Sequence, residues 1–236
     1  DEERVEWLVK LDVPFIKIGS QDLTNLKHVG YIAEQGKPVI LSVGMANMAE
    51  IEQTLEVIYS KGNKEVILLH CNAAYPPKWK DVNLNNIPML KAAFGVQVGF
   101  SDHSRGTALA SAAVALGASV IEKHIKIEGP CRDEAVSLNP SELKEMVANV
   151  RNVALALGSS KKILSEDEKK RRVSVWGRRS VLAGRSLKAG EIIQEEDLIF
   201  KRPGTGIPVN RYTYVVGRKL NKDKNPEEQI LWDDLE

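Results

Sequence analysis

Two histidines carry the clearest chemical signal in this sequence. His103 and His124 each follow a short apolar run, and the two runs are consecutive along the chain. Such runs predict buried strands, and neutral imidazoles at neighbouring strand ends could share a divalent metal ion. Two protein ligands would leave most of the coordination shell to water or substrate, which suits a catalytic metal. The alternative is that both histidines are structural.

A carboxylate belongs to the same group of residues. Glu122 has the strand parity of His124, so both side chains should point to one side of the strand. This carboxylate could support the metal ligands or carry a proton. A plain salt bridge to a lysine is the alternative for Glu122.

Lysine and serine side chains follow the other apolar runs. Lys17, Ser20, Ser42 and Ser101 stand at or just after strand-like ends. A lysine, hydroxyl groups and backbone amides at strand ends predict a cradle for an oxyanion or phosphate. Serine is common at strand ends, so this pattern is less specific than the histidine pair. Cys71 reads as a small buried residue, because no second Cys or His motif has zinc-site spacing.

These residues need a scaffold that gathers strand ends, and the chain has the pattern of one. Five apolar, β-rich runs alternate with helical patterns, at 15–18, 38–42, 66–70, 96–101 and 119–124. The helical patterns span 26–34, 48–60, 87–94, 107–116 and 141–157. This alternation predicts an α/β fold with a parallel sheet, whose active site lies at the carboxyl ends of the strands. No Gly-x-Gly-x-x-Gly turn or Walker motif follows a strand, which favours a barrel over a nucleotide-binding fold.

The pattern changes after Gly158. Residues 161–172 are mostly charged, which predicts a solvated linker or a frayed helix. Short β-like runs with Gly and Pro between them then predict a small, mostly β domain. We therefore expect a barrel portion at 1–158, a charged linker at 159–174 and a β-rich domain at 175–236.

Composition narrows the possible function classes. The 236 residues include 33 Lys+Arg and 32 Asp+Glu, and a net charge of +1 argues against a general nucleic-acid or membrane-surface binder. No apolar run approaches the about 18 residues of a transmembrane helix. The acidic start DEERVEW is unlike a signal peptide, and two cysteines suit a reducing compartment. The default expectation is a soluble cytoplasmic protein.

The motifs, taken in order, resemble the N-acetylneuraminate (sialic acid) synthase family. They are KIGSQDLTN, GKPVILSVGMA, LLHCNAAYP, DVNLNNIP, GFSDHSRG, AAVALGASVIEKHI and SLNPSEL. The tail RRSVLAGRSLKAGEIIQEEDLIFKRPGTGIP resembles that family's SAF (antifreeze-like) domain. The resemblance implies a (β/α)₈ TIM barrel, of which this chain would hold about the last five strands, followed by the small β-rich SAF domain. It also implies a domain-swapped homodimer, in which the SAF domain of one subunit covers the active site of the other.

The same resemblance implies an enzyme that forms a carbon–carbon bond. The family joins C3 of phosphoenolpyruvate to the aldehyde carbon of an open-chain N-acetylated hexose such as N-acetylmannosamine. Water adds at C2, and phosphate leaves the tetrahedral intermediate. A divalent metal ion, Mn²⁺ or Mg²⁺, would polarise the aldehyde oxygen. The product would be a nonulosonic acid for cell-surface polysaccharide, with neither nucleic acid nor a membrane as a partner.

Residue by residue, the resemblance assigns roles to the candidates above. His103 and His124 match the metal ligands, and Glu122 matches the carboxylate beside the metal, so these three are the catalytic candidates. Phosphoenolpyruvate contacts are matched by Lys17, Ser20, Ser42 and Ser101. Contacts to the sugar or to the substrate pair fall at Asp22, Tyr75 and Asp133, at Trp176 in the lid, and at Arg202, which matches an arginine that reaches the N-acetyl group from the partner subunit.

Three positions depart from the family pattern and bear on the choice of sugar. Gln21 stands where a glycine is usual, and Ala73 cannot hydrogen-bond through its side chain. The loop around Asp133 differs in length from the family's loop. Legionaminate-type and pseudaminate-type substrates therefore stay open beside N-acetylmannosamine.

The chain begins inside a helical pattern at Val5, Leu8 and Val9, so we expect the family's first three strands to be absent. Five strands cannot close an eight-stranded barrel, and open edges are sticky. We therefore expect these residues alone to be inactive and poorly soluble, with an exposed apolar interior.

Two other interpretations of the function stay open. One is a non-catalytic binding or assembly module, which the retained metal pair argues against. The other is a phosphoenolpyruvate aldol-type synthase acting on a sugar phosphate, which the SAF domain argues against.

Overall fold

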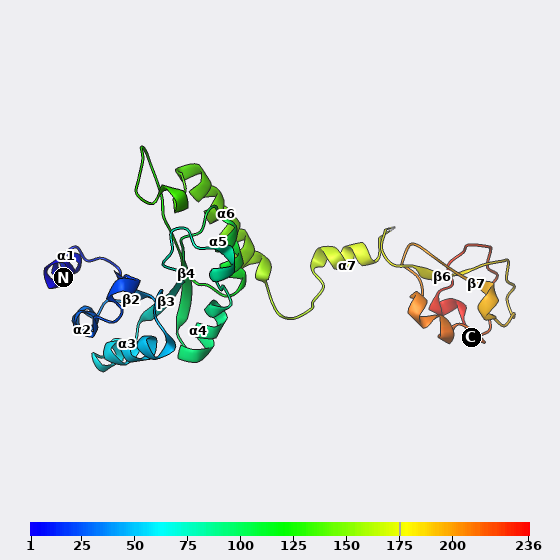
Figure 1. The fold of residues 1–236 in the computed structure, drawn as a ribbon. Coiled ribbons are helices and arrows are strands. Elements are labelled where there is room, and N and C mark those ends of the chain that lie inside the picture. The colour runs from blue at the N-terminus through cyan, green and yellow to red at the C-terminus, as the bar shows by residue number, and fades with distance from the viewer. Residues whose placement is uncertain (175) are drawn as a thin grey trace. The chain divides into compact units, whose positions relative to one another are not determined.

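The chain forms two compact units, Asp1–Gly158 and Ser159–Glu236, each with its own core (Figure 1). This is a computed structural model, and it describes residues 1–174 and 176–236. Val175, the first residue of the expected β-rich domain, lies outside the described residues. None of the helices described has both the length and the apolar character needed to cross a membrane.

A curled sheet of five parallel strands forms the centre of the first unit (Figure 1). The strands lie side by side in chain order: β1 (Ile16–Ile18), β2 (Val39–Ser42), β3 (Val66–Cys71), β4 (Gln97–Asp102) and β5 (Ile121–Lys123). Each falls within or next to a run that the sequence predicted. The α/β prediction, a partial barrel of five strands, is confirmed.

Helices alternate with these strands. They are α1 (Glu2–Lys10), α2 (Leu26–Glu34), α3 (Met48–Ser60), α4 (Asn86–Phe94), α5 (Ala108–Ala115) and α6 (Pro140–Leu157). Local chemistry sets their starts. Asn47 and Glu50 form a capping box at α3, and Asn139 and Glu142 form another at α6, so backbone groups that lack helical partners are satisfied. This is why the expected starts and stops lie within a residue of the observed ones.

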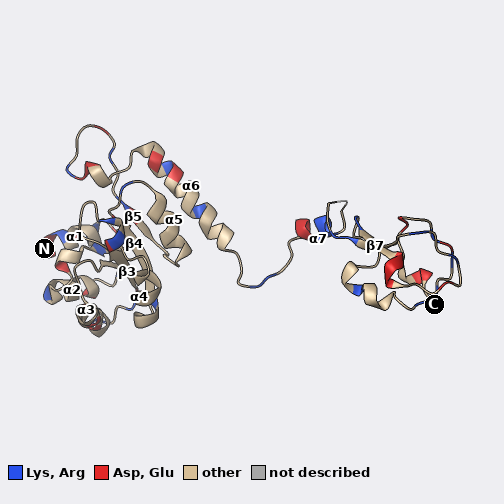
Figure 2. Cartoon of the chain, turned by 45° about the vertical axis from the view of Figure 1, so that its right-hand side comes forward, with Lys and Arg blue, Asp and Glu red and all other residues tan. Residues whose placement is uncertain are grey.

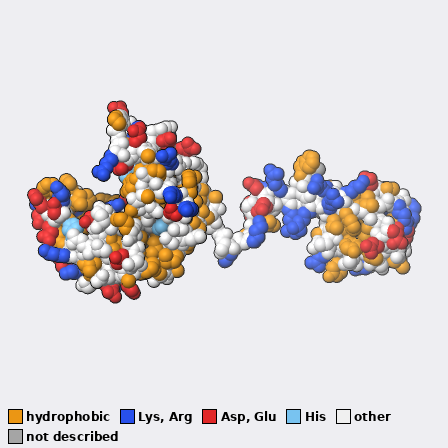
Figure 3. All heavy atoms as spheres, viewed as in Figure 1, with side chains coloured by type: hydrophobic (Ala, Val, Ile, Leu, Met, Phe, Trp, Pro, Cys, Tyr) orange, Lys and Arg blue, Asp and Glu red, His pale blue; other side chains and the backbone are white. Residues whose placement is uncertain are grey.

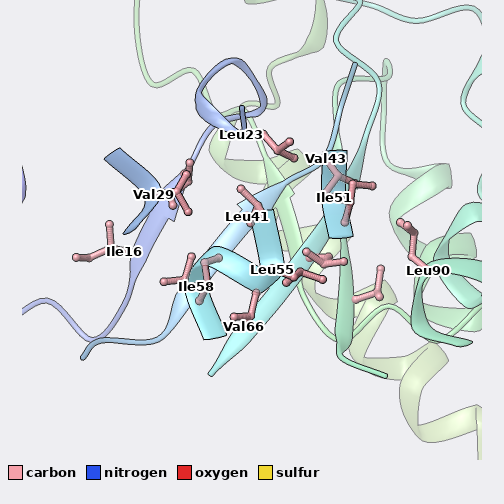
Figure 4. Close-up of a cluster of buried hydrophobic side chains, with 14 of the residues drawn as sticks. Ile16, Leu23, Val29, Leu41, Val43, Ile51, Leu55, Ile58, Val66 and Leu90 are labelled. Carbon is pink, nitrogen blue, oxygen red and sulfur yellow. The ribbon is translucent and has the colours of Figure 1, made fainter. Parts of the chain in front are cut away.

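The two faces of the strands differ in character. One face packs against the helices, mainly in one large apolar core, to which Ile16, Leu41 and Val66 contribute from the strands, and Val29 and Ile58 from the helices (Figure 4). Because side chains alternate along a strand, the residues between the core positions point to the other, inner face. Near the carboxyl ends of the strands this inner face carries polar side chains and one thiol: Lys17, Ser42, Cys71, Ser101 and Glu122.

The sheet curls enough to bring side chains from its two edge strands into contact at the inner face. β1 and β5 are the outermost strands of the sheet. With neighbouring strands about 4.8 Å apart, a flat sheet would separate them by about 19 Å. Lys17 Nζ from β1 nevertheless lies 3.3 Å from Glu122 Oε1 of β5. The curvature therefore gathers inner-face side chains from all the strands around one hollow.

The inner face is less exposed than we expected. Ile40 and Leu69 point to this face, and they are only 8% and 1% exposed. Gly99 accounts for much of the burial of Leu69, because a Cβ at position 99 would lie 2.6 Å from Leu69 Cδ2. The leucine therefore packs directly on glycine backbone. The expectation of an exposed apolar interior is wrong at these positions, because strong curvature lets side chains cover one another.

The second unit is built from turns and short bridges around one antiparallel strand pair. Helix α7 (Glu166–Arg172) comes first, with acidic residues in its first turn and basic residues in its last (Figure 2). The pair is β6 (Ser180–Ala183) with β7 (Leu198–Lys201). Isolated bridges, such as Leu187 with Lys224, tie further segments to a small apolar core. Lys and Arg side chains gather on the visible face around α7 and the segment that follows it (Figure 3).

Replacing Gly99 by alanine should lower the stability of the first unit. The new Cβ would lie 2.6 Å from both Leu69 Cδ2 and the carbonyl oxygen of Val120, and a backbone oxygen cannot turn aside. We expect Gly99→Ala to lower the free energy of unfolding by about 1–3 kcal/mol. Urea unfolding of the 236-residue chain, followed by circular dichroism, measures this change.

The matched control for this experiment is Gly30→Ala. Gly30 lies inside α2, where a Cβ would meet nothing closer than 3.4 Å. Removing a glycine from a helix interior should raise stability by up to about 1 kcal/mol. If Gly99→Ala unfolds at the same urea concentration as the unmodified chain, the close packing of Leu69 on Gly99 is wrong.

Candidate active site

One hollow of about 620 Å³ at the carboxyl ends of the strands collects most of the predicted site residues. Eight of them line it: Lys17, Ser20, Ser42, Tyr75, Ser101, His103, Glu122 and His124. The rest of the lining comes from Gly19, Gln21, Met45, Cys71, Ala73 and Lys123. The strand-end pattern in the sequence thus corresponds to one shared pocket, as a parallel sheet requires.

Glu122 is held by hydrogen bonding from two sides of the hollow. It is the register partner of Ser101 across β4 and β5, and Ser101 Oγ donates a 2.6 Å hydrogen bond to Glu122 Oε1. Lys17 Nζ lies 3.3 Å from the same oxygen. Both side chains of this ion pair are about one-third exposed, so water weakens it. The salt bridge left open as an alternative for Glu122 is therefore present, and it lies inside the pocket.

The imidazole of His103 is oriented by the backbone. Its Nδ1 lies 2.7 Å from the carbonyl oxygen of Asn72. Because a carbonyl only accepts, Nδ1 must donate, and in the neutral ring Nε2 then keeps its lone pair. Burial lowers the pKa of His103, against the opposing effect of the Asn72 hydrogen bond, and the nearby His124 lowers it further. The site therefore favours a neutral imidazole whose lone pair is on Nε2, 3.3 Å from Ser101 Oγ.

His124 lies beside His103 in a similar arrangement. The centres of the two rings are 5.3 Å apart. His124 Nδ1 lies 3.5 Å from Asp133 Oδ2, which is ion-pair distance, so a carboxylate is close to this nitrogen of the second histidine. The ring of Tyr75 stacks on His103 at 4.0 Å and meets the edge of His124 at 5.4 Å. Tyr75 thus packs against both imidazoles.

The histidine pair suits a metal ion with an open coordination shell. Histidines that ligate metals commonly donate their other ring nitrogen to a carbonyl or carboxylate oxygen. His103 does so to the carbonyl of Asn72, and the carboxylate of Asp133 lies close to the same nitrogen of His124. Across residues 1–174 and 176–236, no group of three or more His, Cys, Asp or Glu side chains is arranged to hold a metal. Two imidazoles would therefore leave the other coordination positions to water or a ligand.

The part of the hollow next to β1 and β2 suits an anion. Lys17 supplies an ammonium group, and Ser20 Oγ accepts a 3.0 Å hydrogen bond from the Gly44 amide, which leaves its own proton free to donate. Ser42 is 2% exposed, and no group within the described part of the chain hydrogen-bonds to its Oγ. A buried hydroxyl without a partner is costly. An anionic oxygen in the hollow would satisfy it.

Four predicted site residues do not line the hollow. Asp22 ends the short 3₁₀ helix Ser20–Asp22 and faces a different depression, which it shares with His28. Asp133 reaches the site only through His124. Trp176 and Arg202 belong to the second unit, where Trp176 is 82% exposed and Arg202 Nε donates to the carbonyl of Gly177 at 3.1 Å.

Met45 and Lys123 also border the hollow, Lys123 from a strand position whose side chain points to the helix side, and no pattern in the sequence singled out either residue. Met45 has left-handed backbone (φ 64°) in the turn after β2 and is 74% exposed. The turn residue Gly44 marked a break in the chain but gave no sign that the next side chain would line a pocket. Lys123 is almost fully buried and pairs with Asp102 at 3.2 Å. In a sequence, charges buried as a pair look the same as surface charges, so nothing singled it out.

Known proteins share this architecture. The pattern of the NeuB family matches residues 1–162, and that of the SAF domain matches residues 178–236. The N,N'-diacetyllegionaminic acid synthase of Campylobacter jejuni is 41% identical over 98% of this chain and 70% of its own length. The N-acetylneuraminate-9-phosphate synthase of Homo sapiens is 36% identical over 98% of this chain and 65% of its own length.

A solved structure covers the whole chain. The crystal structure of a spore coat polysaccharide biosynthesis protein from Bacillus subtilis matches 100% of this chain and 71% of its own, with a TM-score of 0.63 and 31% identity. The strand-end motifs had indicated the same family, and that recognition is confirmed. The chain therefore belongs to the NeuB family and carries a SAF domain at its C-terminal end.

Proposed function

We propose that this protein is a nonulosonic acid synthase, which condenses phosphoenolpyruvate with an open-chain N-acetylated hexose and releases phosphate. One observation carries the proposal: the hollow brings an edge suited to an anion, a carboxylate and a pair of histidines together in about 620 Å³. The reaction needs the same three functions. The names of the Campylobacter and human relatives, both synthases of sialic-type acids, support this class of reaction.

Phosphoenolpyruvate is the substrate that fits the edge next to β1 and β2. Lys17 and Ser20 would bind its charged oxygens, and Ser42 Oγ would gain the hydrogen-bond partner it lacks among the described residues. Ser101 donates its only proton to Glu122, so its contact with phosphoenolpyruvate requires that proton to turn toward the ligand. These contacts would hold C3 of phosphoenolpyruvate facing the histidine pair.

The sugar's aldehyde oxygen would lie at the histidine pair. His103 and His124 are suited to hold Mn²⁺ or Mg²⁺ through Nε2, since each Nδ1 faces another oxygen. A bound divalent ion would polarise the aldehyde and make its carbon a better target for C3. Asn72 and Tyr75 keep the His103 ring in place, through its hydrogen bond and the stacking contact.

Glu122 is the group placed to move protons in this reaction. Addition of water at C2 releases a proton, and Glu122 is a carboxylate inside the hollow that can accept it. The hydrogen bond from Ser101 and the ion pair with Lys17 fix the position of the carboxylate. The aldehyde oxygen, which is an alkoxide once the carbon–carbon bond has formed, takes up one proton. The C2 hydroxyl then gives up its proton as the bond from C2 to the bridging oxygen breaks, which leaves a keto group at C2 and releases hydrogen phosphate.

The second unit and the assembly are part of the same proposal. We infer a homodimer in which the SAF domain of one subunit supplies Trp176 and Arg202 to the pocket of the other. The exposure of Trp176 supports this role, because a large exposed aromatic side chain is typical of a contact surface. We also keep the cytoplasm as the proposed location, since Cys71 and Cys131 are free thiols.

The identity of the sugar is a choice between N-acetylmannosamine and a diacetamido hexose. The Campylobacter relative is named for N,N'-diacetyllegionaminic acid, which favours the diacetamido class. Gln21 also lines the hollow, and its carboxamide could hydrogen-bond to an acetamido group.

The full gene product that carries this sequence should release phosphate from phosphoenolpyruvate only when a hexose and Mn²⁺ are both present. We expect His103→Ala to lower kcat/KM at least about 100-fold, because it removes one of two metal ligands. A coupled phosphate assay with N-acetylmannosamine and a diacetamido hexose in parallel measures this. His28→Ala is the matched control, because His28 lies in α2 outside the hollow.

The assay's outcomes separate the candidate functions. Release with only the diacetamido hexose keeps the reaction and assigns the sugar. No release with any sugar, together with no Mn²⁺ binding, would overturn the synthase and leave a non-catalytic binding module. The same assay on the isolated 236 residues tests the expectation that they are inactive alone.

Replacing Glu122 by glutamine should slow turnover without loosening the metal. Glutamine keeps the shape of the side chain and can still accept the Ser101 hydrogen bond, but it cannot take up a proton from water. We expect kcat to fall about 100- to 10,000-fold, with the Mn²⁺ Kd nearly unchanged. Steady-state kinetics and calorimetry measure the two quantities. The control is Glu34→Gln, which removes the charge of a carboxylate in an exposed ion pair with Lys61. An unchanged kcat for Glu122→Gln would refute the proposed role of Glu122 in proton transfer.

A further inference from the structure

A buried ion pair lies directly behind the hollow, and nothing in the reaction described so far uses it. The side chains of Asp102 and Lys123 are 0% and 1% exposed, with Asp102 Oδ2 and Lys123 Nζ 3.2 Å apart. They are register partners on β4 and β5. Taking two charges out of water is costly, and apolar side chains of similar volume are often as good for stability. Stability alone is therefore a poor account of this pair.

The position of the pair in the sequence relates it to the hollow. Asp102 stands between Ser101 and His103, and Lys123 stands between Glu122 and His124. Because strand side chains alternate, the residues before and after each charge face the hollow, while the charges face the helix side of the sheet. The ion pair thus forms the last register level of β4 and β5, one residue before each histidine.

The pair also holds the chain just beyond His103. Lys123 Nζ donates a hydrogen bond to the carbonyl oxygen of Ser104, and Asp102 Oδ1 accepts a 2.8 Å hydrogen bond from the Ser104 amide. His103 is therefore bracketed by two anchored residues, one of them tied to the strand that leads to His124. An apolar pair could fill the same space but could not make these directional contacts.

We propose that Asp102 and Lys123 are positioning residues, which set the separation of His103 and His124 by clamping the end of β4 to β5. The inference rests on the proposed function for the metal that the two histidines would share. Its structural part is independent: the clamp keeps the His103 ring at its hydrogen bond to Asn72 and 5.3 Å from His124.

The test is the double variant Asp102→Asn/Lys123→Met in the full gene product. It removes both charges together, nearly keeps the volume and retains an acceptor for the Ser104 amide, so the fold should persist. We expect the Mn²⁺ Kd, from calorimetry or the EPR signal of free Mn²⁺, to rise about 10- to 100-fold. The control Glu34→Gln/Lys61→Met makes the same change of charge on an exposed pair of the same unit and should leave the Kd unchanged.

A second variant covers the case in which the double variant does not fold. Asp102→Glu keeps the charge pair but moves the carboxylate by one methylene group. It should also weaken Mn²⁺ binding, whereas a clamp with no positioning role would tolerate it once folding is confirmed by circular dichroism.

A metal-free measurement separates this inference from the proposed function. Long-range ¹H–¹⁵N NMR reports which imidazole nitrogen carries the proton, and His103 should be the Nδ1–H tautomer in the unmodified protein. In the double variant we expect a mixture of tautomers. If the unmodified protein does not bind Mn²⁺, the proposed metal site fails, yet a tautomer change would still support the clamp. A folded double variant with the original Kd and the original tautomer would overturn the inference.

Discussion

The contact between Lys17 and Glu122 joins the first strand of the sheet to the last, and the hollow depends on the curvature that permits it. Parallel strands twist, and with helices packed on one face the open sheet curls around the other. At that inner face, residues from five strands reach a common volume. A flatter sheet would keep the same side chains in the same order but spread them along an edge, with no shared pocket.

Because side chains alternate along a strand, each strand contributes both to the apolar core and to the lining of the hollow. The outer residues, such as Leu41 and Phe100, build the core, while their neighbours Ser42 and Ser101 face the hollow. Gly99 lies on the inner face, where the apolar side chain of Leu69 packs directly on its backbone. The polar residues that line the hollow follow next along the same strands. The polar residues of the hollow therefore lie next to tightly packed apolar side chains such as Leu69, and this packing limits how far they can move.

Each unit has a buried ion pair at a place where a strand ends or where the chain forms no regular helix or strand. Asp102 and Lys123 stand where β4 and β5 end, and Lys224 and Asp234 pair at 2.6 Å in the second unit, with side chains 3% and 0% exposed. Among its described residues, the second unit has one antiparallel strand pair and several isolated bridges, so directional contacts replace part of what a larger sheet provides. In each case the charges hold backbone segments that hydrophobic packing alone would leave free to slide.

The sequence by itself determined the five β-α units, the helix ends, the family and most residues of the hollow. These follow from local rules: apolar periodicity, capping residues such as Asn47, and motifs such as SDHS at strand ends. Only the tertiary structure decided that Lys17 meets Glu122, which nitrogen of His103 donates to Asn72, that Asp22 faces elsewhere, and that Lys123 is buried against Asp102. Those facts depend on sheet curvature and on contacts between residues far apart in the chain, and no local pattern encodes either.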